Sequence, residues 1–360
     1  MSKIMDYSSE YPKIVINVGG LEGVGSVYKK SSQGLREFND LWLKHRKVDV
    51  VWDLRLVQNN RISIAALAFF LSIAHRVHHF TEKPQKVLLN WHSRTLGFLS
   101  DVGFFQVAKY YDLFEWPFEL GGFEEGKINP NSKVLSFDEL DVNRPDYFSQ
   151  SALAKWKMIH REHYREDIIR RCASLFSSKD KISDSRDSIL ILSRTCAELA
   201  VNSLLWGKAS AFMGLQRSNK RITISVSDIG IGMKESLRQK NSGNDYSRFD
   251  TDTVAVITSC ILNENDFGLK RAIETVIKSK GTISIASGCA EIVWAKPMWD
   301  RFLSTMKAQS FNDACDTLPD VISKANLNER DNGYIREWKY SIKGTRITFS
   351  LPTGKQEVWV

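Results

Sequence analysis

A carboxylate and an amide, Glu198 and Asn202, lie four residues apart in a stretch with helical spacing of apolar residues. Residues at that spacing share one face of a helix. A carboxylate placed there can accept a proton from an attacking water. An amide oxygen can bind Mg²⁺, which prefers oxygen ligands and keeps several waters. Alone, the pair predicts no more than a polar helix face, because such pairs are common on solvated helices.

Residues 221–228 alternate and end on a carboxylate, Asp228. The alternation predicts a strand that turns this carboxylate to the same face as Ile222, Ile224 and Val226. A buried carboxylate needs a hydrogen-bond donor, and the amino group of an adenine would supply one. Gly230 and Gly232 follow at once, and glycine permits positive φ and a close backbone approach. The simpler interpretation is a strand followed by a glycine turn, with Asp228 as a cap.

A second amphipathic helix is expected from Gly268 onward, with apolar residues at Leu269, Ala272, Ile273, Val276 and Ile277. A helix start opened by glycine presents free N–H groups to a phosphate. Each such contact is worth only about 0.3–1 kcal/mol, so several must converge with a metal to hold a triphosphate. Near the end of the chain, Thr345 shares the inward face of another alternating stretch, residues 343–352.

Together these pieces resemble, in their order, the motifs of the GHKL ATPase family: Glu198 and Asn202, Asp228-x-Gly230-x-Gly232, Gly268-Leu269, and Gly344-Thr345. The resemblance covers residues 183–353. The family includes histidine kinases, anti-sigma serine kinases, type II topoisomerases, mismatch-repair ATPases and heat-shock chaperones. The resemblance implies an α/β sandwich of the Bergerat type, with ATP bound between the helices and the sheet.

The match of motifs also implies roles for single residues. Asn202 would bind Mg²⁺, Asp228 would bond the adenine amino group of ATP, and Thr345 would support the adenine site. Where the family hydrolyses ATP, Glu198 would be the general base. The remaining positions would border the phosphates and the segment that covers them: Gly230, Gly232, Gly268 and Leu269.

The chain departs from the family pattern in places. The second glycine-rich motif usually has several glycines, whereas here residues 263–267 precede a single Gly268, which weakens the expected grip on phosphate. Trp206 and Lys208 lie where many members carry a His or Lys. Residues 234–265 are expected to cover the nucleotide. An insertion around 290–340 is expected to form either a partner surface or an inserted helix with no special role.

Strand and helix patterns alternate over residues 1–120, which predicts a small α/β domain. The most apolar helix is expected over 62–77, and Gly103 is expected to end a later one. Strands are expected at residues 14–18, 48–52, 87–91 and 110–114. The whole chain is therefore expected to be α/β, a strand–helix domain followed by an α/β sandwich.

The N-terminal part resembles a STAS domain, the fold of anti-sigma-factor antagonists. The resemblance rests on the strand at 48–53, a Val57-Gln-Asn-Asn loop, the apolar helix, and the closing Gly103-Phe-Phe and Tyr111-Asp-Leu-Phe sequences. The family's phosphorylatable Asp-Ser-Ser-Gly turn is absent, and Asn60-Arg-Ile-Ser63-Ile occupies its place. Ser63 is thus a candidate phosphoryl acceptor, but the favoured interpretation is a serine that starts a helix.

Residues 121–182 are expected to form a turn-rich linker and then one helix over 152–176. This helix carries His160 and His163, which would be phospho-acceptors in a histidine kinase. Such kinases need a long two-helix hairpin before the ATP domain, and only one helix fits before residue 183. Both histidines are therefore assigned to a linker-helix surface, and residues 183–355 to the ATP-binding domain.

The composition is that of an ordinary folded protein, with 42% hydrophobic and 26% charged residues. Its five cysteines form no C-x-x-C pair, so neither a zinc site nor a disulfide framework is indicated, and a cytoplasmic location fits best. No apolar run approaches the about 20 residues of a membrane span, and no signal peptide is visible. The net charge of +8 would suit nucleic acid, but acids and bases are interspersed, so that partner is not favoured.

The sequence therefore predicts a regulator that binds Mg²⁺ and ATP, either a slow ATPase or an anti-sigma-type protein-serine kinase. One alternative is a binding module that senses nucleotide without turnover. Another is a DNA-acting ATPase, against which the missing transducer domain of those relatives counts. A regulatory protein partner is expected, and a homodimer stays open.

Overall fold

The computed structural model describes residues 11–58, 61–90, 92–117, 119, 129, 131–137, part of 152–170, 186–205, 207, 209–239, 250–261, 269–306, 311–324 and 333–352. The chain divides into two compact units, Met1–Ile128 and Asn129–Val360. The first contains a parallel sheet and the second an antiparallel sheet, both with helices. The expected α/β class is confirmed at this level.

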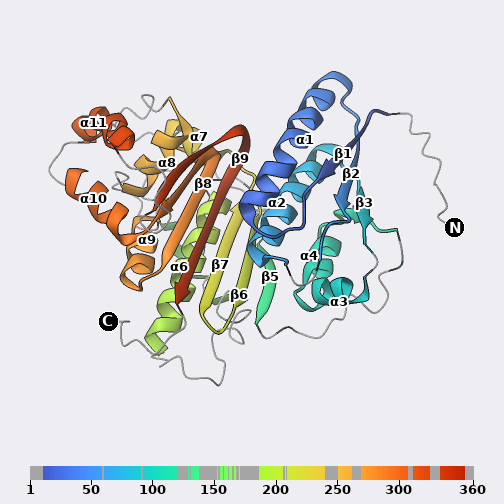
Figure 1. The fold of residues 1–360 in the computed structure, drawn as a ribbon, viewed down its shortest axis with the longest axis horizontal. Coiled ribbons are helices and arrows are strands. Elements are labelled where there is room, and N and C mark those ends of the chain that lie inside the picture. Colours follow the sequence, from blue (N-terminus) through green and yellow to red (C-terminus); the bar gives the residue numbers. More distant parts are fainter. Residues whose placement is uncertain are drawn as a thin grey trace. The chain divides into compact units, whose positions relative to one another are not determined.

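Strands and helices alternate in the first unit (Figure 1). Its sheet is parallel, in chain order: β1 (Lys13–Asn17), β2 (Asp49–Leu54), β3 (Gln85–Leu89) and β4 (Phe114–Glu115). The helices between the strands are α1 (Val24–His45), α2 (Ile64–Thr81), α3 (Ser93–Asp101) and α4 (Phe104–Tyr110). The first three expected strands and the apolar helix are confirmed, with ends shifted by a few residues.

Aromatic rings hold the helices against this sheet. Phe70 of α2 contacts Trp52 of β2 and Phe114 of β4, with ring centroids 5.3 and 5.7 Å apart. Phe104 of α4 stacks on the same Phe70 at 6.4 Å. Both helices therefore pack on one face of the sheet. Because α2 also contacts α1, apolar residues surround most of its circumference.

Three details bear on the expectations for this unit. The last strand begins at Phe114, not at Tyr110, because Tyr110 ends α4 and Asp112 turns the chain at a φ of +50°. Gly103, at a φ of +86°, lies just after the C-cap of α3 and is itself the N-cap of α4. Ser63 is the N-cap of α2, where its hydroxyl accepts a 3.5 Å hydrogen bond from the N–H three residues later. The helix-start interpretation of this serine is confirmed.

The second unit is built on an antiparallel sheet whose strands lie in the order β5 (Ser132–Phe137), β6 (Ala211–Arg217), β7 (Arg221–Asp228), β9 (Tyr334–Pro352) and β8 (Thr282–Trp294). The helices with complete bounds are α6 (Arg186–Leu205), α7 (Gly232–Gln239), α8 (Asp252–Ile261), α9 (Leu269–Lys278), α10 (Lys296–Met306) and α11 (Phe311–Lys324). No described helix in the chain is long and apolar enough to cross a membrane.

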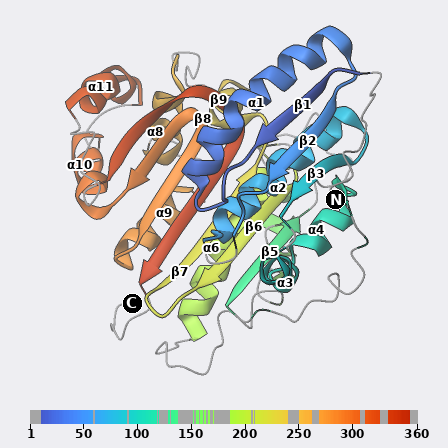
Figure 2. The same ribbon diagram turned by 45° about the vertical axis from the view of Figure 1, so that its right-hand side comes forward.

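The core of the second unit lies between its sheet and helices α6, α8 and α9 (Figures 1 and 2). Alternate residues of β7 and β9 are buried in it, including Ile224, Val226, Ile347 and Phe349. The amphipathic pattern expected for α9 is confirmed, since its five apolar residues are all buried. This packing places the end of β7, which pairs with the middle of β9, beside α6, where the candidate site forms.

The expectation that residues 121–182 form only a linker and a helix is wrong for residues 132–137. Ser132–Phe137 is the edge strand β5, which pairs antiparallel with β6. The second unit accordingly begins at Asn129 rather than at residue 183. The short sequence of β5 has no clear alternation, so its role as a strand depends on a partner that lies far along the chain.

The described residues between 152 and 170 are helical, as expected. Trp156 packs against the core of the second unit, and His160 stacks on it with ring centroids 3.9 Å apart. The insertion around 290–340 comprises the outer parts of β8 and β9 together with two helices, α10 and α11, rather than one. Because α10 buries Met298 and Phe302, this helix is part of the core.

Candidate functional site

Asp228 ends β7 with a side chain that is only 1% exposed. Its Oδ1 accepts hydrogen bonds from the backbone N–H of Gly230 at 2.9 Å and of Thr345 at 3.2 Å. Its Oδ2 has no hydrogen-bond partner among the described residues. A buried carboxylate oxygen without a donor destabilises the fold, and a donor on a ligand would offset that cost.

Burial raises the pKa of the Asp228 carboxyl to about 6. The N–H of Gly230, the nearby Ser203 hydroxyl, the N–H of Thr345 and the charge of Arg346 lower the pKa, but by less than burial raises it. The Ser203 hydroxyl donates its hydrogen to Leu199 O at 3.3 Å, so Oδ2 of Asp228 is left without a donor among the described residues. At pH 7 the carboxylate is therefore mostly ionised while being poorly solvated. A group in that state gains strongly from one more hydrogen-bond donor.

Two close backbone contacts fix the surroundings of this carboxylate. Ile231 N donates to Gly207 O at 2.9 Å, and a Cβ at Gly230 would lie 1.8 Å from the same oxygen. Gly344 has a φ of +91°, and a Cβ there would lie 2.1 Å from the carbonyl oxygen of Asp228. Side chains are thus excluded at both positions. These two glycines permit the packing that positions Asp228.

A serine hydroxyl on β8 joins two further parts of the site. Ser287 Oγ accepts a hydrogen bond from Met233 N at 2.9 Å and donates one to Gly344 O at 2.8 Å. Met233 lies in the first turn of α7, directly after Gly232, whose φ is +79°. Thr345 pairs with Asp228 on one side and with Ser287 on the other. The start of α7 and the end of β7 are therefore linked through β9.

Asn202 and Glu198 lie one turn apart on α6, as expected. Asn202 lines a cavity beside Asp228, and its Oδ1 is buried with no hydrogen-bond partner in the described part of the chain. Glu198 is also buried, at 6% exposure, but it is not among the residues that line the cavity. Asn202 therefore belongs to the candidate site, whereas the carboxylate of Glu198 is buried outside the cavity lining.

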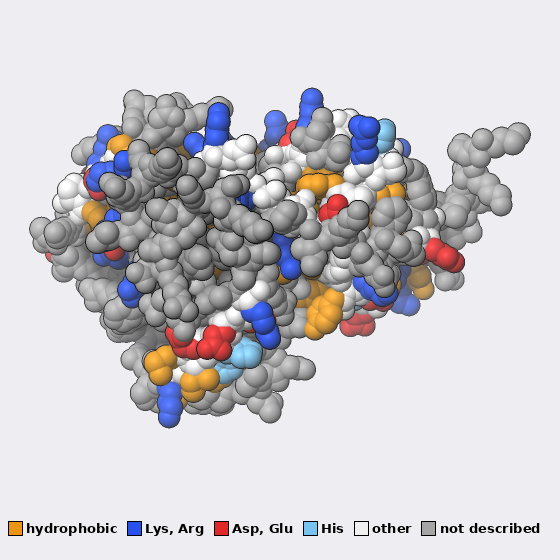
Figure 3. Space-filling view, turned by 90° about the horizontal axis from the view of Figure 1, so that it is seen from below, with side chains coloured by type: hydrophobic (Ala, Val, Ile, Leu, Met, Phe, Trp, Pro, Cys, Tyr) orange, Lys and Arg blue, Asp and Glu red, His pale blue; other side chains and the backbone are white. Residues whose placement is uncertain are grey.

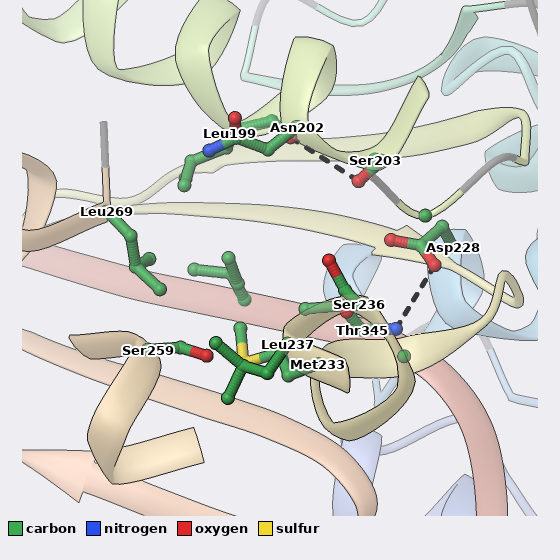
Figure 4. Close-up of a pocket in the computed structure, with 13 residues that line it drawn as sticks. Leu199, Asn202, Ser203, Asp228, Met233, Ser236, Leu237, Ser259, Leu269 and Thr345 are labelled. Atoms are coloured by element: carbon green, nitrogen blue, oxygen red, sulfur yellow. Dashed lines mark hydrogen bonds between the residues drawn. The ribbon is translucent and has the colours of Figure 1, made fainter. Parts of the chain in front are cut away.

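The cavity beside Asp228 is small, about 60 Å³ (Figure 4). Side chains from α6, α7, α8, α9, β7 and β9 surround it. Glu198 and Gly230 do not line it, and Gly268 lies outside the described residues. The residues predicted from the sequence that do line it are Asn202, Asp228, Gly232, Leu269 and Thr345.

The remaining lining residues were not predicted one by one: Leu199, Ser203, Gly207, Met233, Ser236, Leu237, Ser259 and Ile347. Ser236, Leu237 and Ser259 do lie in the segment 234–265 that was expected to cover the nucleotide. Some carried a usable signal. Leu199 and Ser203 are four residues apart on the helix that carries Asn202, and Met233 and Leu237 are four apart directly after Gly232. Gly207 offered no such pattern, because only the tertiary fold brings it beside Asp228.

The site has two chemical features, a buried pair of polar oxygens and apolar walls. Within the described residues, no group of three or more His, Cys, Asp or Glu side chains could hold a metal ion. Comparisons of the chain with protein-family models, curated proteins and solved structures return no match. The geometry of the site is therefore the basis for assigning it a function.

Proposed function

We propose that the second unit binds Mg·ATP and acts as a nucleotide-dependent regulatory module of the GHKL type. The observation that carries this proposal is the buried Oδ2 of Asp228, an acceptor that has no donor among the described residues. The amino group of adenine is a planar donor that fits this need. Apolar side chains of the lining, such as Leu199 and Ile347, would contact the ring faces.

Asn202 supports the metal part of the proposal. Its buried Oδ1 is a neutral oxygen ligand, and Mg²⁺ usually combines one or two protein oxygens with phosphates and water. When bound, the ion would offset the negative charge of the phosphates. With one such ligand and no acidic cluster in the described residues, the protein should take up Mg²⁺ together with the nucleotide.

A second candidate function is nucleotide sensing without turnover. The observation that favours it is the burial of Glu198 outside the cavity lining. The ATPase and protein-serine kinase forms of the proposal both need a general base that reaches the attacking hydroxyl or water. Glu198 would have to move to serve as that base.

For the first unit, we propose the recruitment of a regulatory protein partner, which its resemblance to STAS domains motivates; a homodimer is a further form of this proposal. The parallel order of its strands and helices supports the resemblance to STAS domains.

Nucleic acid is not favoured as a partner. On the face drawn in Figure 3, the described Lys and Arg side chains are dispersed among acidic and hydrophobic ones rather than gathered in one patch.

The first test is thermal unfolding of the full chain with and without Mg·ATP. Nucleotide about 100-fold above its Kd should stabilise the native state by roughly 2.7 kcal/mol. Mg²⁺ without nucleotide should produce no comparable shift. If Mg·ATP leaves the unfolding transition unchanged at millimolar concentrations, the proposal fails.

Turnover is tested separately with γ-labelled ATP, measuring free phosphate and labelled protein. If the module is an enzyme, Glu198→Ala should retain binding and lose turnover by about 10²–10⁴-fold. Glu274→Ala on α9, which is not part of the cavity lining, is the matched control. Binding without turnover in the unmodified protein would establish the sensor function. Normal turnover in Glu198→Ala would contradict the role given to this residue.

A further inference from the structure

The cavity beside Asp228 is too small for the nucleotide proposed to occupy it. Its volume is about 60 Å³, whereas an engineered protein cavity that accepts one benzene ring measures about 150 Å³. A purine is larger than benzene. The free Oδ2 of Asp228 is also fully buried in this conformation. Part of the lining must therefore move before a purine can reach the carboxylate.

The side chains of α7 occupy the space next to Asp228. Figure 4 shows Met233, Ser236 and Leu237 from this helix between Asp228 and the Leu269 side of the cavity. Leu237 is buried, and Met233 packs against the core of the unit. The helix α7 has eight residues and buries only Gly232 and Leu237, whereas α8 and α9 bury eight and five residues. Displacing α7 therefore disturbs the core less than displacing either of those helices.

The attachment of α7 to the rest of the fold is unusual. A helix normally takes its N-terminal cap from the residue just before it, most often Ser, Thr, Asp or Asn. The residue before α7 is Ile231, which has no side-chain acceptor. The N–H of Met233 instead donates to Ser287, a residue of β8 that lies 54 positions along the chain. The cap of α7 is therefore lost whenever the helix leaves the sheet.

We propose that Ser287 is a latch that holds α7 over the cavity and so controls the entry of nucleotide. Its hydroxyl caps α7 and at the same time donates to Gly344 O, beside the N–H of Thr345 that holds Asp228. The latched conformation excludes a purine, and the unlatched one admits it. This inference rests on the proposed nucleotide site and adds a residue that positions the access to it.

If Ser287 holds α7 closed, removing its hydroxyl should strengthen nucleotide binding rather than weaken it. When only a fraction of molecules is open, the measured Kd exceeds the intrinsic one by the inverse of that fraction. Ser287→Ala removes the cap and raises the open fraction. Loss of a cap is typically worth a factor of about five in an equilibrium, so the variant should bind Mg·AMP-PNP roughly three- to tenfold more tightly, with faster association.

The experiment compares wild type, Ser287→Ala and Ser287→Cys by stopped-flow association and by titration calorimetry with Mg·AMP-PNP. Ser284→Ala is the matched control, because Ser284 lies on the same strand and bonds Glu291, away from the cavity. Hydrogen exchange over α7 without nucleotide is the second measurement. It should be faster in Ser287→Ala, intermediate in Ser287→Cys and unchanged in Ser284→Ala.

Weaker binding by Ser287→Ala, or binding equal to wild type, would overturn the latch while leaving the nucleotide site in place. Such a result would mean that Ser287 has a structural role alone. Absence of binding in wild type and in every variant would instead refute the nucleotide site and the latch together. The two failures are thus distinguished by the wild-type titration.

Discussion

Each unit has an aspartate at or next to the end of a buried strand, and the two carboxylates have opposite surroundings. Asp53 is the penultimate residue of β2 and Asp228 is the last of β7, and both accept a hydrogen bond on Oδ1 from the N–H two residues later. In the first unit that residue is Arg55, whose guanidinium donates to both carboxylate oxygens at 2.9 Å. In the second unit it is Gly230, which has no side chain that could donate a further hydrogen bond to the carboxylate.

The pKa values follow from this difference. The hydrogen bond from Arg55 holds the pKa of Asp53 below its ordinary value. Burial raises the pKa of Asp228 to about 6. A carboxylate at the end of a strand is therefore not in itself a sign of a binding site. A carboxylate whose hydrogen bonds are completed by its own chain contributes to structure, whereas one left with an unpaired oxygen can gain a hydrogen bond from a ligand once the lining of the cavity moves.

The largest expected effect comes from giving residue 230 a side chain. In Gly230→Ala the new Cβ would overlap Gly207 O, 1.8 Å away, so the second unit should lose about 3 kcal/mol or more of stability. Gly97→Ala is the control, since nothing lies within 4 Å of a Cβ at that position in α3. It should be neutral or stabilising by about 0.5–1 kcal/mol. Urea unfolding measures both, and equal stabilities would contradict the close packing beside Asp228.

An intermediate effect is expected in the pH dependence of stability. The carboxyl of Asp228 has a raised folded pKa, about 6 against 3.8 when unfolded. Its contribution to stability is therefore present below pH 4 and is lost as pH rises through 6, by up to about 3 kcal/mol. Asp228→Asn does not titrate, so its stability relative to wild type should improve between pH 4 and pH 7.

Asp53 should show the reverse sign. Its pKa is lowered in the fold, so its contribution is present above the unfolded value and is lost as pH falls through the folded one. Asp53→Asn should therefore be less stable than wild type at pH 7 and approach it in acid. Urea titrations of both variants from pH 3 to pH 7 test the pair. Parallel curves would mean that the two carboxylates do not differ as described.

The smallest effect is expected from Arg55→Ala. The guanidinium is largely exposed, so the change in stability should be slight. The pKa of Asp53 should nevertheless rise toward its ordinary value, because the donor that lowers it is gone. An NMR titration of the Asp53 carboxyl follows this shift directly. An unchanged pKa would show that another group, not Arg55, sets it.

The local patterns of the sequence predicted the elements that carry the site. The alternation of β7, the apolar face of α9 and the strand-end position of Asp228 all depend on residues near one another in the chain, and the structure has them. Helical spacing placed Glu198 and Asn202 on one side of α6. Helical spacing could not predict which of the two side chains reaches the cavity, and of the two only Asn202 lines it.

The parts that could not be predicted depend on contacts between distant segments. Gly207 matters because its carbonyl meets the turn after β7, and Ser287 because it caps a helix from another strand. Likewise, β5 is a strand because β6 offers it an edge. No local pattern encodes such pairings, since they arise from the packing of the whole unit.

The role of Asp228 in nucleotide binding is tested by the affinity for Mg·AMP-PNP of wild type, Asp228→Asn and Asp53→Asn, measured by titration calorimetry. The amide in Asp228→Asn replaces an acceptor oxygen by a donor facing the adenine amino group. Loss of a charged hydrogen bond of this kind costs about 1.5–3 kcal/mol, so affinity should fall roughly 10- to 100-fold. Asp53→Asn should bind as wild type does. Equal affinities for all three proteins would contradict the claim that the open oxygen of Asp228 is the ligand-binding group.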